Sequence, residues 1–157
     1  QQDFSGDALV PEVQSDLTLD ELSQSDVIVM VGSNVRFEQP LLSHRIRQAS
    51  LYQAKVYAIN PVSFNFNFDI QFECLSSNLV HSLSQLAKAI GIQDAALASV
   101  EVKTEITQWA SELKAAENPI ILLGNYALES EHAATIKTLA KLIVELLNGK
   151  LMLKLLP

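Results

Sequence analysis

The sequence has 157 residues, of which 48% are hydrophobic and 18% are charged. This composition is typical of one ordinary globular domain with a sizeable core. Eleven basic residues against eighteen acidic ones give a formal net charge of −7. That balance argues against binding to the phosphate backbone of nucleic acids or to an anionic membrane surface.

The ends of the sequence bear on whether it is a fragment, and its cysteine content bears on its cellular compartment. The chain opens on Gln1 without a methionine and closes on an apolar run that ends at Pro157. We therefore expect a fragment of a longer polypeptide. Cys74 is the single cysteine, no N-terminal stretch resembles a signal peptide, and no apolar run approaches the ~20 residues of a membrane span. A cytoplasmic location is expected.

The first part of the chain predicts a polar arm followed by a helix and a strand. Residues 1–17 are polar and without periodicity, so we expect a surface arm, with a single domain over residues 18–157. A capping-box pattern, Thr18 to Glu21, opens a short helix. The run from Asp26 to Gly32 is β-branched and continuous, which is typical of a strand buried on both faces.

A strand–helix–strand unit follows. Pro40 stands in the first turn of a predicted helix, whose apolar residues recur at helical spacing. A second strand covers residues 55–59 and is closed by Asn60 and Pro61. Such a unit predicts parallel strands with a right-handed crossover.

The second half repeats this alternation. Helical apolar stripes run from Leu79 to Ile90, from Ile106 to Leu113 and from Ile136 to Leu147. Between the last two lies a third buried strand, residues 120–123, and a fourth strand begins at Lys150. Alternating strands and helices predict an α/β fold, a Rossmann-like three-layer sandwich with a mostly parallel sheet flanked by helices.

The turn after the first strand is the most site-like segment. Gly32, Ser33 and Asn34 precede a helix, where backbone amides suit a phosphate. However, a dinucleotide fingerprint needs three glycines, and this loop has one. A structural turn is favoured over a remnant of a ligand loop. Gly124 and Asn125 end the third strand in the same way.

Charged and metal-binding candidates favour structural roles. Arg36 has Glu38 nearby, which favours ion pairing over an anion site, and Arg45 and Arg47 fall on a solvated helix face. Cys74 has no histidine partner in local sequence and is expected to be a buried small apolar residue. Because the histidines also stand singly, no metal site and no catalytic residue is predicted. These histidines are His44, His81 and His132.

Residues 59–68, INPVSFNFNF, alternate phenylalanine with asparagine after the second strand. In an extended segment, this period places the rings of Phe64, Phe66 and Phe68 on one side and the amides on the other. Stacking platforms for single-stranded nucleic acid need basic surroundings, and the nearest charge here is Asp69. We therefore expect a loop anchored by its rings to the body of the protein or to a neighbour.

Three stretches carry a family resemblance: SDVIVMVGSNVRFEQPLLSHRIRQA, AKVYAINPVSFNFNF and NPIILLGNYAL. Together they resemble the family of the large peripheral-arm subunit of bacterial NADH-quinone oxidoreductase, respiratory complex I, and more broadly the molybdopterin oxidoreductase superfamily. In molybdopterin enzymes, the loops matching Gly32-Ser33-Asn34 and Asn60-Pro61 help to hold a guanine dinucleotide. Those enzymes usually carry an acidic residue where this chain has Asn60, so the resemblance implies that these positions are vestigial.

The resemblance implies a structural, non-catalytic domain of that large subunit, with no cofactor of its own. The parent complex would pass electrons from NADH through iron–sulfur clusters to quinone while translocating protons. Its clusters are expected outside this chain, because Cys74 alone cannot supply a four-cysteine site. Expected partners are the rest of the subunit and other peripheral-arm subunits, on the cytoplasmic side of the bacterial inner membrane. The alternative is a guanine-dinucleotide-binding domain of an active molybdopterin oxidoreductase.

Overall fold

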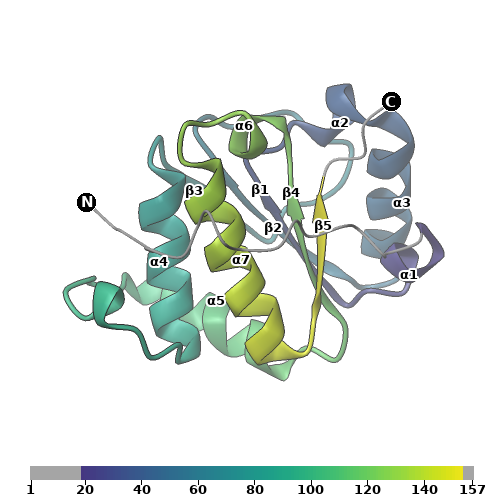
Figure 1. Cartoon of the computed structure of the whole chain (residues 1–157). Coiled ribbons are helices and arrows are strands. Elements are labelled where there is room, and N and C mark those ends of the chain that lie inside the picture. Colours follow the sequence, from purple (N-terminus) through teal and green to yellow (C-terminus); the bar gives the residue numbers. More distant parts are fainter. Residues whose placement is uncertain (1–18, 154–157) are drawn as a thin grey trace.

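The computed structural model describes residues 19–153. The expected arm over residues 1–17 and Thr18 of the capping box lie outside the described residues. Within the described range, the chain forms one sheet with helices on both faces (Figure 1).

The sheet has five strands, all parallel, in the order β3-β2-β1-β4-β5. The strands are β1 (Val27–Val31), β2 (Lys55–Asn60), β3 (Phe72–Leu75), β4 (Pro119–Leu123) and β5 (Lys150–Leu153). This is the order of doubly wound dinucleotide-binding folds, with β1 at the point where the winding reverses. The prediction of a parallel α/β sandwich is confirmed.

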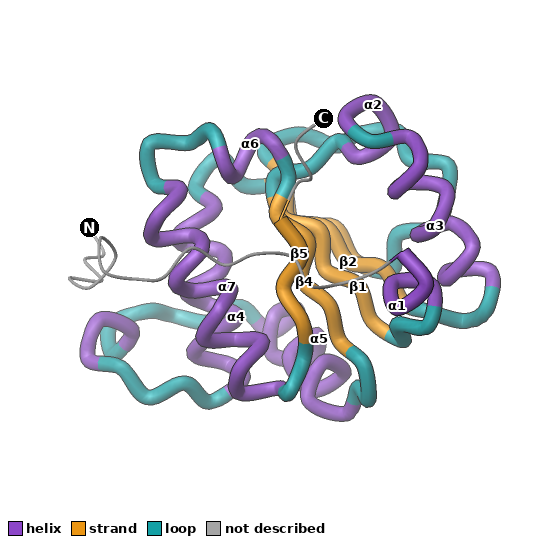
Figure 2. The backbone as a smooth tube through the Cα atoms, turned by 45° about the vertical axis from the view of Figure 1, so that its right-hand side comes forward, coloured by secondary structure: helices purple, strands orange, loops and turns teal. Residues whose placement is uncertain are grey.

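Helices cover the two faces unequally, as Figure 2 shows with the sheet nearly edge-on. One face carries two short helices, α1 (Leu19–Ser23) and α2 (Val35–Glu38), together with the longer α3 (Pro40–Leu51). The other carries α4 (Leu79–Ile90), α5 (Thr104–Ala115) and α7 (Ala133–Leu147). A 3-10 turn (Ala95–Leu97) precedes α5, and α6 (Asn125–Leu128) precedes α7.

The alternation of side chains along each strand divides the interior into two cores. Val27, Val29 and Val31 of β1 point into the larger core beneath α4, α5 and α7. Ile28 and Met30 point into the smaller core beneath α1 and α3. Because a strand buried on both faces shows no polar alternation, the continuous apolar run of β1 correctly indicates its central position.

The sequence predicts four strands, and this number is wrong because it omits β3. β3 has only four residues, lies at the edge of the sheet and is partly exposed along its length. A short edge strand of this kind lacks the buried apolar run that marks a central strand. Cys74, expected to be buried, lies on this strand and is only half-buried, packed against the larger core.

The phenylalanine loop, residues 61–71, connects β2 to β3 and confirms the predicted alternation of half-buried rings and exposed asparagines. Phe66 and Phe68 pack against the smaller core and stack on each other, with ring centroids 5.3 Å apart. The hydroxyl of Ser43 on α3 donates a hydrogen bond to Oδ1 of Asn67 at 3.1 Å. The loop is therefore anchored to the body of the domain on the α3 face.

Replacing Phe66 with alanine should lower the free energy of unfolding by about 1–3 kcal/mol, less than for a fully buried ring. The reason is that Phe66 packs against the smaller core and also contacts the rings on both sides of it. It stacks on Phe68, and Phe64 meets it edge-on with ring centroids 6.3 Å apart. Urea denaturation measures the effect. Phe64→Ala is the matched control, because its ring lies at the outer end of the row; equal losses in both variants would contradict the anchoring role of Phe66.

A small ionic cluster at the amino edge of the sheet predicts a pH dependence. Lys55 Nζ lies 2.5 Å from Oε1 of Glu112, and the hydrogen bond from Lys55 lowers the pKa of Glu112, with a further contribution from Tyr57. Burial, followed by the effect of Glu112, raises the pKa of the Tyr57 hydroxyl. Glu112 therefore stabilises the folded state mainly in its ionised form.

Since the folded-state pKa of Glu112 is depressed, its contribution is present above the unfolded value of about 4.3 and is lost as the pH falls through the lower folded value. Glu112→Gln should therefore lose stability at neutral pH, by about 1 kcal/mol or less for a partly exposed pair, and match the wild type at low pH. Thermal melts across this pH range test it, and a pH-independent difference would contradict it.

Candidate functional site

The candidate site lies at the carboxyl edge of the sheet, where β1, β2 and β4 end side by side. In doubly wound folds, ligands bind outside this edge, at the strand where the winding reverses. Here that strand is β1, and the short helices α2 and α6 lie above the edge, at the top of Figure 1. The predicted candidates Gly32, Ser33 and Asn34 follow β1, and Asn60 with Pro61 ends β2.

The structure brings the predicted residues of the two strands into contact. The backbone amide of Ser33 donates to Oδ1 of Asn60 at 2.8 Å, and that of Gly32 donates to the carbonyl of Ile59 at the same distance. Ser33 and Asn60 are both buried, and Asn60 has no exposed surface. The amide side chain at position 60 therefore fixes the turn after β1.

A single carboxylate joins the turns that follow β1 and β4. Oε2 of Glu38 accepts from the amide of Asn34 at 2.9 Å, and Oε1 accepts from the amide of Asn125 at 3.1 Å. Hydrogen bonds to a charged acceptor are stronger than neutral ones. Glu38 thus places a negative charge between the starts of α2 and α6, which is where an anionic ligand group would compete for the same amides.

The two turns also approach each other too closely to admit a ligand between them. A Cβ on Gly124 would lie 2.3 Å from Cβ of Ser33, and one on Gly32 would lie 2.6 Å from the backbone nitrogen of Ala127. Gly32 has a φ of +59°, which also favours glycine. Both glycines therefore serve the contact between the turns, and neither leaves an open cradle.

All six backbone amides of the two turns have partners within the chain. Besides the four amides described above, Gly124 donates to the carbonyl of Val31 at 3.0 Å and Tyr126 donates to the carbonyl of Gly32 at 2.9 Å. Phosphate binding at such an edge depends on free amides that point at the ligand. In this arrangement, residues 32–34 and 124–126 do not fit a phosphate group.

Three asparagines nevertheless keep side-chain atoms without hydrogen bonds at this edge. These atoms are Nδ2 of Asn60, Oδ1 of Asn34 and Oδ1 of Asn125, all buried. An unpaired buried polar group typically costs about 1–3 kcal/mol. The edge therefore retains polar groups that its own packing does not use.

Glu38 is the residue whose part in this edge the sequence does not reveal. Sequence spacing places Glu38 beside Arg36, whereas the structure gives its carboxylate two backbone amides, one of them 87 residues away in sequence. Arg36 Nη1 donates to the carbonyl of Asn65 in the phenylalanine loop at 3.4 Å. The sequence does show a carboxylate four residues after Asn34, which is a signal for the first of these hydrogen bonds. The second partner, Asn125, can be identified only from the folded structure.

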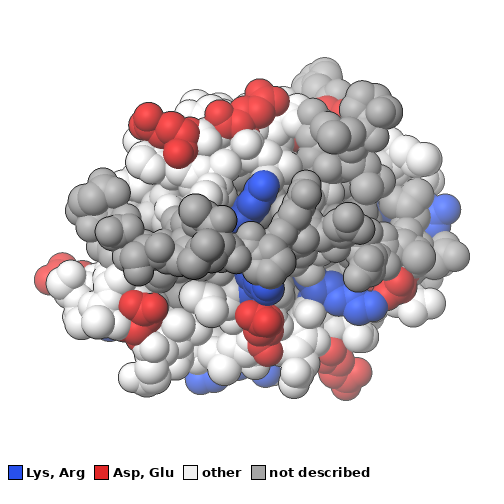
Figure 3. All heavy atoms as spheres, viewed as in Figure 1, with Lys and Arg blue, Asp and Glu red and all other residues white. Residues whose placement is uncertain are grey.

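The remaining candidates lie away from this edge. His44, His81 and His132 are exposed, and no cluster of metal-binding side chains occurs among residues 19–153. A hollow of about 540 Å³ lies between the starts of α4 and α7, with Glu129 and Glu131 in its lining. Figure 3 shows acidic side chains at the top of the molecule, over the connection between α6 and α7.

Within residues 19–153, each helix is too short or too polar to cross a bilayer.

Comparisons with known proteins agree with this architecture. The family model for molybdopterin oxidoreductases matches residues 3–151. The NADH-ubiquinone oxidoreductase 75 kDa subunit of Reclinomonas americana is 25% identical over 128 residues, which are 81% of this chain and 16% of that protein. The chain thus spans about a sixth of this curated relative.

A solved structure shares the fold. It is a chain from the formyltransferase/hydrolase complex FhcABCD of Methylorubrum extorquens, solved with methylofuran, with a TM-score of 0.61 and 20% identity. The match covers 97% of this chain and 42% of that one. Because the family model covers nearly the whole sequence, this chain belongs to the molybdopterin oxidoreductase family.

Proposed function

We propose that this chain is a structural, non-catalytic domain of the large peripheral-arm subunit of a bacterial NADH-quinone oxidoreductase. In that role it scaffolds the cluster-bearing remainder of its own subunit, on the cytoplasmic side of the inner membrane. The parent complex would transfer electrons from NADH through iron–sulfur clusters to quinone and translocate protons.

The observation that carries this proposal is the carboxylate of Glu38 between the amides of Asn34 and Asn125. A domain that binds a dinucleotide needs such amides for phosphate. Here a side chain of the domain itself occupies the amides, and the close contact of Gly124 with Ser33 closes the same gap. Both features favour a rigid edge and oppose ligand entry.

Within the family, the NADH-ubiquinone oxidoreductase relative supports a role in that complex over a role in a cofactor-binding enzyme. Its 75 kDa subunit aligns with 81% of this chain. Asn60 agrees with this choice as well, because its neutral amide replaces the carboxylate that the cofactor-binding branch is expected to carry, and its Oδ1 is used by Ser33.

The second candidate is a domain that binds the guanine dinucleotide of a molybdopterin cofactor. The unpaired atoms of Asn34, Asn60 and Asn125 favour it, since a ligand could satisfy them if the turns opened. Opening would require breaking both hydrogen bonds of Glu38. We favour the structural role because the closed form satisfies all six amides.

The proposed function can be tested on the natural assembly. The gene for the protein that contains this sequence would be tagged in its host, and the purified assembly assayed for NADH:quinone activity and for metals. We expect NADH oxidation with quinone and abundant iron without stoichiometric molybdenum. An assembly that contains molybdenum and lacks NADH:quinone activity would refute the proposal.

A further inference from the structure

The outer face of α3 differs from the rest of the surface in both charge and apolarity. All three arginines of the sequence, Arg36, Arg45 and Arg47, fall on α2 and α3, and α3 contains no acidic residue. The whole chain, by contrast, has a formal net charge of −7. Figure 3 shows a small basic patch at the right-hand edge of the molecule, where Figure 1 places α3.

The same helix exposes large apolar side chains. Leu41 is 64% exposed, Leu51 is 67% exposed and Tyr52, at the end of the helix, is 84% exposed. The opposite side of α3 faces the smaller core and is fully buried. Its inward residues are Leu42, Ser43, Ile46 and Ala49.

Helical geometry gathers the outward residues into one strip. Leu41, His44, Gln48 and Leu51 recur at intervals of three and four residues and so share one face. Arg45 and Arg47 flank that strip on its two sides. The leucines at its two ends are about 15 Å apart at 1.5 Å per residue, a length of nearly three helical turns.

We propose that this strip, the α3 face (Leu41, His44, Gln48, Leu51, Tyr52 and the flanking Arg45 and Arg47), is a docking surface for an acidic, amphipathic helix of another protein segment. Apolar anchors spaced by helical turns suit a helix laid along them, and the flanking arginines suit carboxylates on both sides of its apolar stripe.

Charge argues against a second copy of this chain as the occupant, and shape argues against a small ligand. Two copies of α3 packed antiparallel would place Leu41 of one against Leu51 of the other, but they would also bring the arginines of both copies together. A small ligand would need a concave pocket. A protein segment is also consistent with the length of the relatives, because this chain matches 16% of the 75 kDa subunit and 42% of the solved chain.

The test is a titration of the isotopically labelled 157-residue chain, followed by amide chemical shifts. The probe is a synthetic helical peptide with leucines along one face and glutamates on both sides of it, and the control peptide has lysine at each glutamate. We expect saturable shifts confined to α3 with the acidic peptide alone. No saturable shift, shifts on another face, or equal binding of the lysine peptide would overturn the proposal.

Matched variants separate docking from nonspecific binding. Leu51→Glu and Arg47→Glu should each weaken the acidic peptide by about tenfold or more, since both place a like charge in the interface. Leu146→Glu is the control, because Leu146 is 51% exposed on α7, on the opposite face of the sheet. Equal weakening by Leu146→Glu, or a concentration-dependent dimer of the chain alone, would count against the α3 face.

Discussion

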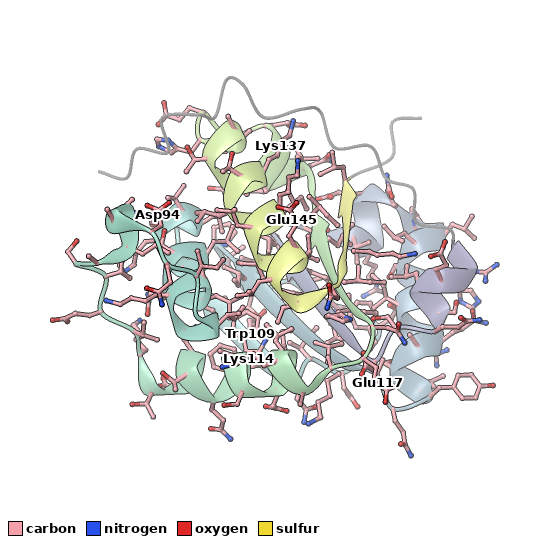
Figure 4. The ribbon with its side chains drawn as sticks, turned by 60° about the horizontal axis from the view of Figure 1, so that its bottom comes forward. Asp94, Trp109, Lys114, Glu117, Lys137 and Glu145 are labelled. Carbon is pink, nitrogen blue, oxygen red and sulfur yellow. The ribbon has the colours of Figure 1, made fainter. Side chains whose placement is uncertain are left out.

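Replacing Trp109 with alanine should lower the free energy of unfolding by about 3–5 kcal/mol, the cost of removing a large aromatic ring from a core. Trp109 lies on α5 and is almost fully buried. Its ring meets Tyr57 of β2 edge-on at 5.1 Å and Phe72 of β3 at 5.4 Å. Figure 4, which views the molecule from below, labels Trp109 beside Lys114 of the same helix.

Two variants control this prediction. Trp109→Phe should cost much less, because it keeps a ring in the core and because the indole Nε1 has no hydrogen bond to lose. Gln108→Ala changes an exposed neighbour on the same helix and should leave stability within about 0.5 kcal/mol of the wild type. Urea denaturation measures all three. A loss below about 1 kcal/mol for the alanine variant would show that α5 is not fixed to the sheet through this ring.

Replacing Glu38 with alanine should destabilise the domain by about 2–4 kcal/mol. The change removes the acceptor of two backbone amides at once, and hydrogen bonds to a charged group contribute about 1.5–3 kcal/mol each. The expected total is smaller than the sum because both bonds are only partly buried, so water can replace part of what is lost. The loss should appear in denaturation and also as faster hydrogen exchange at the amides of Asn34 and Asn125. These two amides belong to different turns, so a joint effect identifies the bridge.

Glu38→Gln separates the charge from the acceptor. It keeps one oxygen but directs an amide group toward the second donor, so we expect an intermediate loss. Glu101→Gln serves as the charge control, since Glu101 is exposed and lies outside the helices and strands. If Glu38→Ala were as stable as Glu101→Gln, the carboxylate would not hold the turns together.

The central strands and long helices could be predicted because their signals are local. The buried run of β1, Pro40 at the start of α3 and Gly91 after α4 each follow from periodicity or from the conformational limits of one residue. β3 could not be predicted in this way, because a four-residue edge strand is defined by its pairing with β2.

The candidate site was predictable in position but not in chemistry. Sequence alone places Gly32, Ser33, Asn34 and Asn60 after parallel strands, and the structure brings Ser33 and Asn60 into contact. The bridge by Glu38 depends on a partner 87 residues away, which local spacing does not indicate. The close approach of Gly124 to Ser33 is likewise a tertiary contact.

Asp26 makes a similar long-range bridge at the amino edge of the sheet, and local sequence does not indicate this bridge either. Its carboxylate accepts from the amides of Glu117 and Asn118, both at 2.8 Å, and so ties the start of β1 to the turn before β4. Asp26 and Glu38 therefore join β1 to the β4 side at opposite ends of the strand. In the sequence, both are single acidic residues without a distinguishing pattern.

The most direct test of the central claim is isothermal titration calorimetry of this chain with GDP, which carries the guanine base and the phosphates of the cofactor's nucleotide. A domain whose turns are closed by Glu38 should give no saturable heat up to about 1 mM ligand, and its melting temperature should not change. Saturable binding with a dissociation constant in the micromolar range, accompanied by a rise in melting temperature, would contradict the structural role and favour cofactor binding.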